Sequence, residues 1–319
     1  MNSHLSGDVA SQPASYSNTE MDAVQTHDLY KSYGNKEVLH RLNLRVPQGC
    51  LFGFLGPNGA GKTTTIRILL GLLRASSGEA RILGQDVWRK GSTVRADVGY
   101  LPGDVRFYDD MTGRATLAFL DRARGRPVDG GIKRLAEAFD LNLDMRVRDY
   151  SRGMKQKLGL IQALMHQPRL VVLDEPTIAL DPLVRKTLYQ ELRQVAREGR
   201  TVLFSSHTLS EVEELCDHVA IVRDGYLVEQ SRIETLQQAA VRHVEVQFDR
   251  HQPLPYTSPD GLRILYQADN HVAGTWAGHV GPLLDWLAGC DVEDVTIGEP
   301  DLQDLFMAYY TDAAVEQIA

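Results

Sequence analysis

The stretch GPNGAGKTT, residues 56–64, constrains the fold of this chain more than any other segment. It matches the pattern Gly-x-x-x-x-Gly-Lys-[Ser/Thr] and lies between the apolar run CLFGFL and a helix that we expect over residues 62–73. Glycines let a backbone wrap a phosphate so that its N–H groups converge on the oxygens. Lys62 would then reach the β- and γ-phosphates, and the Thr63 hydroxyl would bind Mg²⁺. The stretch therefore predicts a strand–loop–helix unit that binds a nucleoside triphosphate.

Short apolar runs alternate with helical patterns along most of the chain. RLVVLDEP and TVLFSSH are typical of buried strands, and HVAIVRDGYLVE predicts a hairpin that turns at Asp224-Gly225. PLVRKTLYQELRQVAREG predicts a helix between two of these strands, and residues 111–141 are helix-rich, with Thr112 as a cap. Strands alternating with helices around a glycine loop predict an α/β domain with a largely parallel core sheet.

The sequence pattern divides the chain into three parts. Residues 1–22 are rich in Ser and Asn and poor in large apolar residues, which predicts a disordered tail. Residues 23–231 form the α/β domain, and its helical subdomain is expected at about 104–165. Residues 232–319 predict a small α+β domain without a catalytic constellation. Its expected elements are strands in HVEVQF, LRILY and DVEDVTI, a helix in VGPLLDWLAG and a last helix in PDLQDLFMAYY.

Composition limits the other classes of function. The net charge of -8 and the pI near 5.7 argue against the basic surface of most nucleic-acid-binding proteins. Three widely spaced cysteines fit a reducing compartment without a disulfide framework or a zinc site. No apolar run approaches the roughly 18 residues that span a bilayer, and no secretory signal is recognisable. If the protein acts at a membrane, we expect another polypeptide to span it.

Two strand ends carry groups suited to phosphate chemistry. Asp174 and Glu175 follow LVVL, at the end of a parallel strand where ligands usually bind. Asp174 can hold Mg²⁺, and Glu175 can orient or deprotonate an attacking water. Taken alone, this pair fits a solvated acidic turn better, but the phosphate loop upstream favours the functional interpretation. His207 follows TVLFSS on a strand expected beside that of Asp174, so it should reach a γ-phosphate, although most of the ten histidines should be surface or structural groups.

A second anion-binding feature is predicted in YSRGMKQKLGL, residues 150–160. Ser151 is a suitable helix cap, and Gly153 leaves backbone N–H groups bare in the first turn. Such a helix start attracts anions through its unpaired N–H groups and its dipole.

Over roughly residues 24–230, the chain resembles the ATP-binding subunit of an ABC transporter. Four motifs that occur in this order carry the resemblance: GPNGAGKTT, YSRGMKQK, VVLDEPTIALDP and SSH. The resemblance implies a P-loop NTPase fold of the ABC type, with a mixed core sheet, an antiparallel β subdomain and a helical subdomain. The C-terminal part resembles more loosely the tail of ATPases that export drugs, lipids or polysaccharides. For that part we favour stabilisation or dimer contact over effector sensing.

The resemblance also implies roles for single residues. Glu175 and His207 match the catalytic carboxylate and the residue that contacts the γ-phosphate and the attacking water. Thr63 and Asp174 match the Mg²⁺ ligands, and Asp181 the aspartate that communicates between subunits. Tyr33 matches the aromatic residue that stacks on adenine; Tyr30 is the alternative, and either could belong to the core. The implied ATP-binding residues are Tyr33, Gly56, Pro57, Asn58, Gly59, Ala60, Gly61, Lys62, Thr63 and Thr64.

Two positions depart from the family pattern. The signature, usually Leu-Ser-Gly-Gly-Gln, contacts ATP held by the opposite subunit, and its counterparts here are Ser151, Arg152, Gly153 and Met154. Arg152 replaces a glycine and fits a phosphate contact or a solvent-exposed side chain equally well. Gly103 stands where the family has a glutamine that contacts Mg²⁺ and water; Asp104 or a water could partly replace it.

These features predict an Mg²⁺-dependent ATPase that dimerises around ATP and drives an exporter. Its expected partners are a second ATPase subunit and separate integral-membrane permease subunits at the cytoplasmic face of the cell membrane, with no nucleic acid. One alternative is a soluble ABC-type ATPase of DNA repair or translation. Another is a non-enzymatic nucleotide-binding scaffold, and the presence of Glu175 and His207 disfavours this second alternative. The sequence does not identify the transported substrate, because specificity lies in the membrane subunits.

Overall fold

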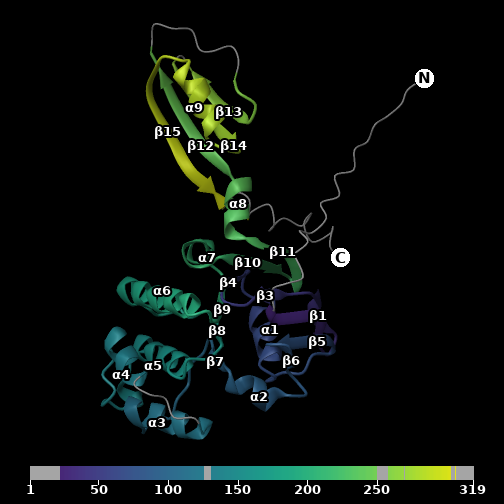
Figure 1. Ribbon diagram of the computed structural model, residues 1–319, viewed down its shortest axis with the longest axis vertical. Coiled ribbons are helices and arrows are strands. Elements are labelled where there is room, and N and C mark those ends of the chain that lie inside the picture. Colours follow the sequence, from purple (N-terminus) through teal and green to yellow (C-terminus); the bar gives the residue numbers. More distant parts are fainter. Residues whose placement is uncertain (1–21, 126–130, 250–257, 269, 303–305, 307–319) are drawn as a thin grey trace, which may run out of the picture.

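The structure is a computed structural model that describes residues 22–125, 131–249, 258–268, 270–302 and 306. The described residues form three β-sheets. Two lie in a larger α/β part, and the third forms a C-terminal part that projects from it beyond helix α8, Ile233–Ala239 (Figure 1). Among the described residues, no helix is both long and apolar enough to cross a membrane.

The core sheet has six strands in the order β11-β10-β4-β9-β8-β7. The strands from β10 to β7 pair in parallel, and β11 joins β10 as an antiparallel hairpin whose turn is Asp224-Gly225, as the sequence predicts. All residues of β4, β8 and β9 are buried because both faces of the sheet are covered. The bounds are β4 Leu51–Leu55, β7 Val98–Leu101, β8 Leu170–Asp174, β9 Thr201–Ser206, β10 His218–Arg223 and β11 Tyr226–Arg232.

An antiparallel sheet of five strands packs beside the core sheet. Its order is β2-β1-β5-β6, with β3 also paired to β1. Alternate residues of β4 face two separate cores: Leu51 and Leu55 face the helical side, and Phe52 and Phe54 face the antiparallel sheet. The phosphate loop leaves the end of β4 between these two cores. The bounds are β1 Asp22–Tyr33, β2 Lys36–Leu42, β3 Arg45–Pro47, β5 Ser77–Ile82 and β6 Gln85–Asp86.

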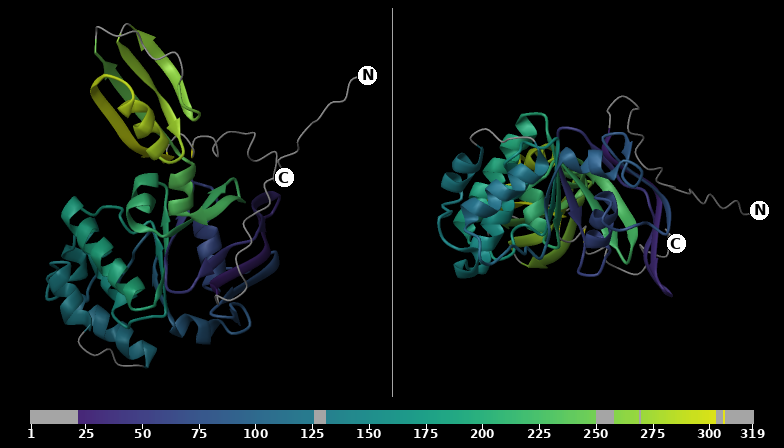
Figure 2. Two further views of the ribbon diagram at one scale, coloured as in Figure 1. Left: turned by 45° about the horizontal axis from the view of Figure 1, so that its top comes forward. Right: turned by 90° about the horizontal axis from the view of Figure 1, so that it is seen from below.

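Helices α3 to α7 cover the other side of the core sheet, whereas α1 and α2 pack on the side of the antiparallel sheet (Figure 1 and Figure 2). Thr112, Ser151 and Asp181 each cap a helix through the side chain. The α/β helices are α1 Lys62–Leu69, α2 Gly91–Ala96, α3 Gly113–Arg124, α4 Gly131–Ala138, α5 Arg152–Leu164, α6 Pro182–Arg197 and α7 Leu209–Leu215.

The expectation that the first helix reaches residue 73 is wrong. Helix α1 ends at Leu69, because Gly71 takes a left-handed conformation (φ 64°) and its N–H bonds to the Ile68 carbonyl. The helix is therefore one turn shorter than its apolar pattern suggests.

The C-terminal part is an antiparallel sheet in the order β13-β14-β12-β15, packed against α9. The strands expected in HVEVQF, LRILY and DVEDVTI and the helix in VGPLLDWLAG are present, whereas β14 and α8 were not predicted. The bounds are α8 Ile233–Ala239, β12 Val241–Phe248, β13 Leu262–Ala268, β14 His271–Ala277, α9 Gly281–Ala288 and β15 Val292–Asp301.

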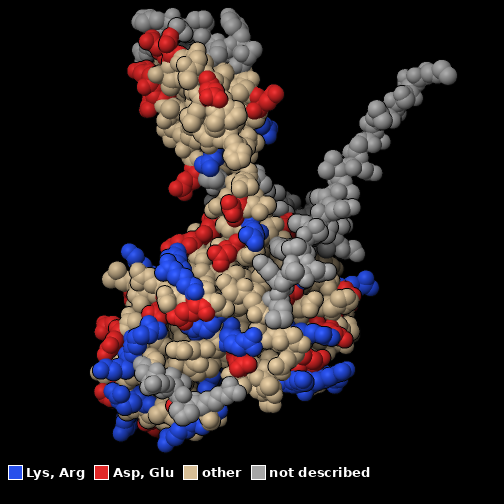
Figure 3. Space-filling view, in the orientation of Figure 1, with Lys and Arg blue, Asp and Glu red and all other residues tan. Residues whose placement is uncertain are grey.

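Two predicted segments lie largely outside the described residues. Of the last predicted helix, the structure describes Leu302 and Phe306 after β15, and both are buried in the core on the helical side of the α/β part. The predicted tail lies outside the described residues except for Asp22, which begins β1. On the face shown in Figure 3, Lys and Arg are interspersed with Asp and Glu over the α/β part.

Candidate nucleotide-binding and catalytic site

The phosphate loop runs from the end of β4 to the start of α1. Gly59 and Gly61 adopt positive φ angles of 88° and 100°, which side-chain-bearing residues rarely take. Gly56 is required for another reason, since a Cβ there would lie 2.3 Å from the Val222 carbonyl oxygen. Gly61 at the N-cap position has no side chain to cap α1, so the backbone N–H groups of the first turn are suited to an anion.

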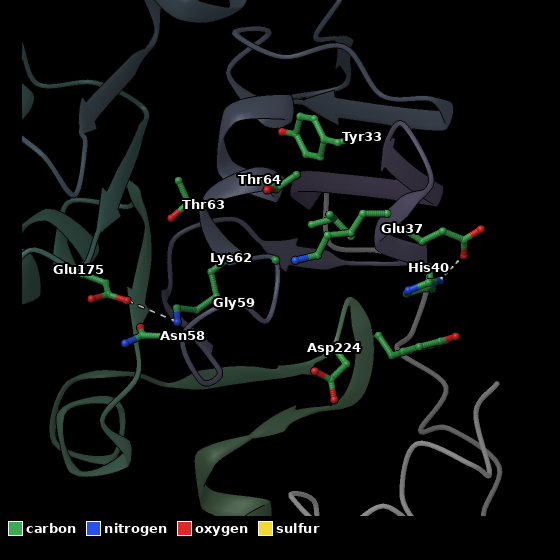
Figure 4. A pocket seen from close by; sticks show the side chains of 14 residues that line it. Tyr33, Glu37, His40, Asn58, Gly59, Lys62, Thr63, Thr64, Glu175 and Asp224 are labelled. Atoms are coloured by element: carbon green, nitrogen blue, oxygen red, sulfur yellow. Dashed lines mark ion pairs between the residues drawn. The ribbon is translucent and has the colours of Figure 1, made fainter.

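Lys62 is buried within this loop, with 4% of its side chain exposed. Its Nζ donates hydrogen bonds to the carbonyl oxygens of Gly56 at 2.6 Å and Pro57 at 3.1 Å. The same atom lies 3.4 Å from Oε1 of Glu175, the pair marked on the left of Figure 4. The loop thus holds a cation at the place where phosphate charge would gather.

Asp174 lies at the end of β8 with each carboxylate oxygen bound. Its Oδ2 accepts a hydrogen bond from the Thr63 hydroxyl at 2.8 Å, and its Oδ1 accepts one from the Ser205 hydroxyl at 2.7 Å. The Ser205 Oγ also accepts the backbone N–H of Glu175 at 3.0 Å. Ser205 therefore orients both acidic residues, a role that the sequence analysis missed although TVLFSSH places it on the neighbouring strand.

The oxygen atoms of Thr63 and Asp174 form a donor set that suits Mg²⁺. Hydroxyl and carboxylate oxygens are hard ligands, and Mg²⁺ usually takes one or two protein ligands together with phosphate and water. The described residues contain no group of three or more His, Cys, Asp or Glu that could hold a metal ion. The set therefore fits an ion bound jointly with a nucleotide rather than an all-protein metal cage.

Glu175 lies between two nitrogen-bearing side chains. Its Oε1 faces Lys62, and its Oε2 lies 3.3 Å from Nδ1 of His207 at the end of β9. Glu175 also has a positive φ of 50°, an uncommon conformation for a residue other than glycine. Strands β8 and β9 are neighbours, as the sequence predicts, and their ends bring Glu175 and His207 together.

A pocket of about 680 Å³ opens above the loop (Figure 4). Tyr33 lies at this pocket with 48% of its surface exposed, and the Lys31 ammonium is 4.9 Å from its ring centre. Tyr30 does not line the pocket, and its ring packs edge-on against His40. The lining residues are Tyr33, Lys36, Glu37, Val38, His40, Asn58, Gly59, Gly61, Lys62, Thr63, Thr64, Glu175, Asp224 and Tyr226.

One wall of this pocket was not predicted from the sequence. The β10–β11 turn meets β2 there, and the His40 N–H donates to the Gly225 carbonyl at 2.9 Å. A Cβ on Gly225 would lie 2.3 Å from the Val38 carbonyl oxygen, so this approach requires glycine. The rings of His40 and Tyr226 stack at 4.3 Å. The Asp-Gly turn was visible in the sequence, but its partner strand was not.

The signature residues lie elsewhere. The Ser151 hydroxyl accepts the Met154 N–H at 3.2 Å, which caps α5, and Arg152 is exposed. A Cβ on Gly153 would lie 2.8 Å from the Ala179 carbonyl oxygen. None of residues 151–154 is among those that line the pocket. The structure therefore does not bring the signature and the phosphate loop together within one chain.

Asp181 begins α6. Its Oδ1 accepts the Val184 N–H at 3.0 Å, and this hydrogen bond holds the pKa of the carboxyl below its ordinary value. Asp181 is thus a helix cap in this chain, and it does not line the pocket.

Gly103 lies beside Asp174. A Cβ at this position would be 3.5 Å from the Asp174 carbonyl oxygen and 3.7 Å from its Oδ2, which is ordinary contact. The neighbouring Asp104 is exposed and paired with Arg106, with 2.7 Å between Oδ2 and Nη2. Position 103 therefore adjoins the acidic strand end, while the Asp104 carboxylate is held by a surface arginine.

Known proteins are similar to this chain over nearly its whole length. The ABC transporter family model matches residues 39–178. The chain is 34% identical over 303 residues to the bacitracin transport ATP-binding protein BcrA of Bacillus licheniformis, covering 89% of this chain and 96% of the relative. It is 36% identical over 209 residues to the Nod factor export ATP-binding protein I of Paraburkholderia xenovorans, with 64% and 68% covered.

A solved structure of an ATP-binding subunit of an ABC transporter superposes with a TM-score of 0.63 at 28% identity, covering 68% of this chain and 92% of that one. This likeness agrees with the phosphate loop, the mixed core sheet and the helical side described above. The chain therefore belongs to the ATP-binding proteins of the ABC transporter family.

Proposed function

We propose that this protein is the ATP-hydrolysing subunit of an ABC exporter. The observation that carries the proposal is the position of Glu175, whose two carboxylate oxygens face Lys62 and His207 at 3.4 and 3.3 Å. With these contacts, Glu175 could act as a base between a phosphate-binding cation and a histidine, next to the phosphate loop. Two relatives are named for bacitracin transport and for Nod factor export, and these names support the export role.

The chemistry is attack of water on the γ-phosphorus of ATP. A new oxygen–phosphorus bond forms, the bond to the β–γ bridging oxygen breaks, and the water proton passes to the Glu175 carboxylate. Lys62 binds the β- and γ-phosphate oxygens, and His207 orients the water and the γ-phosphate from the opposite side of Glu175. Mg²⁺, held by Thr63 and Asp174, would neutralise part of the phosphate charge.

The second half of the proposal is a dimer of two ATPase subunits. The N-terminal turn of α5 has the properties of an anion site, but residues 151–154 do not line the pocket of their own chain. ATP held by one phosphate loop would meet Ser151 and Gly153 of a second subunit. Loss of the γ-phosphate after hydrolysis would remove that contact and open the dimer.

The third part is docking to a membrane subunit. An apolar pocket of about 260 Å³ lies next to the loop that carries Gly103, and Leu72 at its rim is largely exposed. We infer that it receives apolar side chains of a separate permease at the cytoplasmic face of the membrane. Its lining residues are Leu70, Leu72, Arg95, Val98, Tyr100, Pro102, Arg124 and Gln162.

Glu175→Gln tests the catalytic assignment. Turnover should fall by roughly 10²- to 10⁴-fold, because the amide cannot accept the proton, while ATP binding should persist. The measurement is phosphate release by the purified chain, paired with equilibrium binding of a fluorescent ATP analogue. Glu214→Gln, an exposed carboxylate on α7, is the matched control. Normal hydrolysis by Glu175→Gln would contradict the assignment.

Co-purification tests the transport assignment. The tagged chain should extract from membranes together with a multi-span protein, and candidate export substrates should stimulate its ATPase activity in that complex. Stimulation by DNA or by ribosomes, without a membrane partner, would contradict the export role and favour the repair or translation alternative.

A further inference from the structure

Glu211 on α7 is a buried acid that the chemistry above does not use. It has 8% of its surface exposed, and both carboxylate oxygens have partners. Its Oε2 accepts a hydrogen bond from the Ser206 hydroxyl at 2.7 Å, and its Oε1 lies 3.5 Å from Nη1 of Arg185 on α6. A buried carboxylate is costly unless it is paired in this way, so its two partners indicate what it does.

The first partner, Ser206, controls the backbone around His207. Its hydroxyl accepts the Thr208 N–H at 2.9 Å, so one side chain spans the histidine position. Its carbonyl oxygen accepts the Gly56 N–H at 3.3 Å, at the first glycine of the phosphate loop. By fixing the Ser206 hydroxyl, Glu211 fixes the segment from which the His207 ring reaches Glu175.

The second partner, Arg185, belongs to the first turns of α6. Its backbone N–H donates a hydrogen bond to the Asp181 carbonyl oxygen at 3.0 Å. This bond lies in the first turn of α6, the helix that the Asp181 side chain caps. The Arg185–Glu211 pair therefore ties the start of α6 to the segment that carries His207.

The charge of Glu211 is also felt by a neighbouring group. Burial raises the pKa of the Tyr189 hydroxyl, and the negative charge of Glu211 raises it further. This hydroxyl is buried and has no hydrogen-bond partner among the described residues. The acid thus lies in a water-poor environment, where loss of either partner would matter most.

We propose that Glu211 is a positioning residue for ATP hydrolysis, which holds His207 toward Glu175 through Ser206 and links it to α6 through Arg185. The inference rests on the proposed ATPase function. It predicts that Glu211 acts on turnover rather than on nucleotide affinity, because neither Glu211 nor Ser206 lines the nucleotide pocket.

The first test compares Glu211→Ala, Glu211→Gln and the matched control Glu214→Ala, each assayed well below its own melting temperature. We expect kcat to fall about ten-fold in Glu211→Ala, with an unchanged KM for ATP, because His207 moves by a fraction of an ångström. Glu211→Gln keeps an acceptor for the Ser206 hydroxyl and should lie between Glu211→Ala and the wild type. Glu214→Ala should match the wild type.

An unchanged kcat in Glu211→Ala would overturn the inference. A loss of activity that only follows the folded fraction would also overturn it. If the wild-type chain itself fails to hydrolyse ATP, the proposed function fails instead, so the two failures are distinguishable.

The second test separates positioning from support of the fold. In the double variant Arg185→Met with Glu211→Leu, no buried carboxylate is left without its arginine. Its melting temperature should therefore exceed that of Arg185→Met, which leaves the buried Glu211 without this partner. Its kcat should nevertheless stay low, since Ser206 has lost its acceptor. Recovery of kcat to the wild-type value in this double variant would overturn the inference. A low kcat with an unchanged KM supports it whether or not the melting temperature recovers.

Discussion

Two helix starts in this chain have the same electrostatic character and different surroundings. Helix α1 begins at Gly61 inside the 680 Å³ pocket, next to Lys62 and facing the acidic strand end. Helix α5 begins at Ser151, whose hydroxyl takes up the Met154 N–H, and its first residues do not line that pocket. The first start is surrounded by catalytic groups of its own chain, and the second fits a nucleotide brought by another subunit. The contrast shows that an anion-binding helix start identifies a ligand class but not which chain completes the site.

Lys62→Ala should have the largest effect, because it removes the cation from the α1 site. We expect ATP affinity to fall about 100-fold or more, since a buried charged partner is worth about 2–5 kcal/mol. Equilibrium binding of an ATP analogue by the isolated chain measures this. Retention of wild-type affinity would show that the α1 site is not the primary nucleotide site.

Ser151→Arg tests the α5 site in the opposite way. The bulky side chain should keep a second subunit from seating its ATP, so hydrolysis should fall about 50-fold while ATP binding by the same chain stays intact. Thr112→Arg is the control, since it removes the cap of α3 at a cost of about 1 kcal/mol in stability without touching α5. If Ser151→Arg instead abolished nucleotide binding, the two helix starts would serve one site.

Local patterns explain why much of the site could be predicted. The phosphate loop, the caps Thr112 and Ser151, and the acidic pair after β8 each depend on a few consecutive residues. The meeting of Glu175 with His207 was also predictable, because parallel strands present their carboxyl ends at one edge of the sheet.

The features of the site that could not be predicted depend on contacts between segments that are far apart in the sequence. Ser205 became important only when its strand paired with β8, and the His40–Tyr226 wall only when the β10–β11 turn met β2. The end of α1 was misjudged because Leu72 and Leu73 continue the apolar pattern after Gly71 has already broken the helix. Periodicity records burial, not the conformation that a single glycine adopts.

Gly103→Gln tests whether the position beside Asp174 contributes to the reaction at the α1 site. The backbone accepts a side chain here, because φ is not positive and the nearest atoms of Asp174 stand at ordinary contact distance. We expect a two- to five-fold change in kcat with little change in binding, the effect of one added polar contact of about 0.5–1 kcal/mol. Steady-state ATPase assays measure it. An unchanged rate would show that position 103 does not act on the reaction.

A substitution of His166, just after the C-terminal end of α5, should have the smallest effect on activity and tests the stability of the fold. Burial lowers the pKa of His166 from 6.5 to about 4, and the positive charge of Arg124 adds to the shift. Between pH 6.5 and pH 4, His166 binds a proton in the unfolded chain but stays neutral in the folded chain. The free energy of unfolding therefore decreases as the pH falls from 6.5 toward 4. The loss should be about 2 kcal/mol, allowing for partial exposure.

His166→Gln should remove this part of the acid sensitivity and leave turnover at neutral pH unchanged. Urea unfolding at pH 7 and pH 4.5, compared between the variant and the wild type, measures the difference. Equal acid sensitivity in both would assign the effect to other groups.

The close approach of Gly153 to the Ala179 carbonyl has a consequence for how this chain can vary in evolution. Arg152 and Gly153 are adjacent on one helical turn, yet the first is exposed and the second has a backbone oxygen 2.8 Å from where its Cβ would be. Contacts within this chain therefore do not restrict the size of the side chain at position 152. Position 153 can accept a larger residue only if the segment before Asp181 moves as well. Related chains should therefore show substitutions at 153 accompanied by changes near 179.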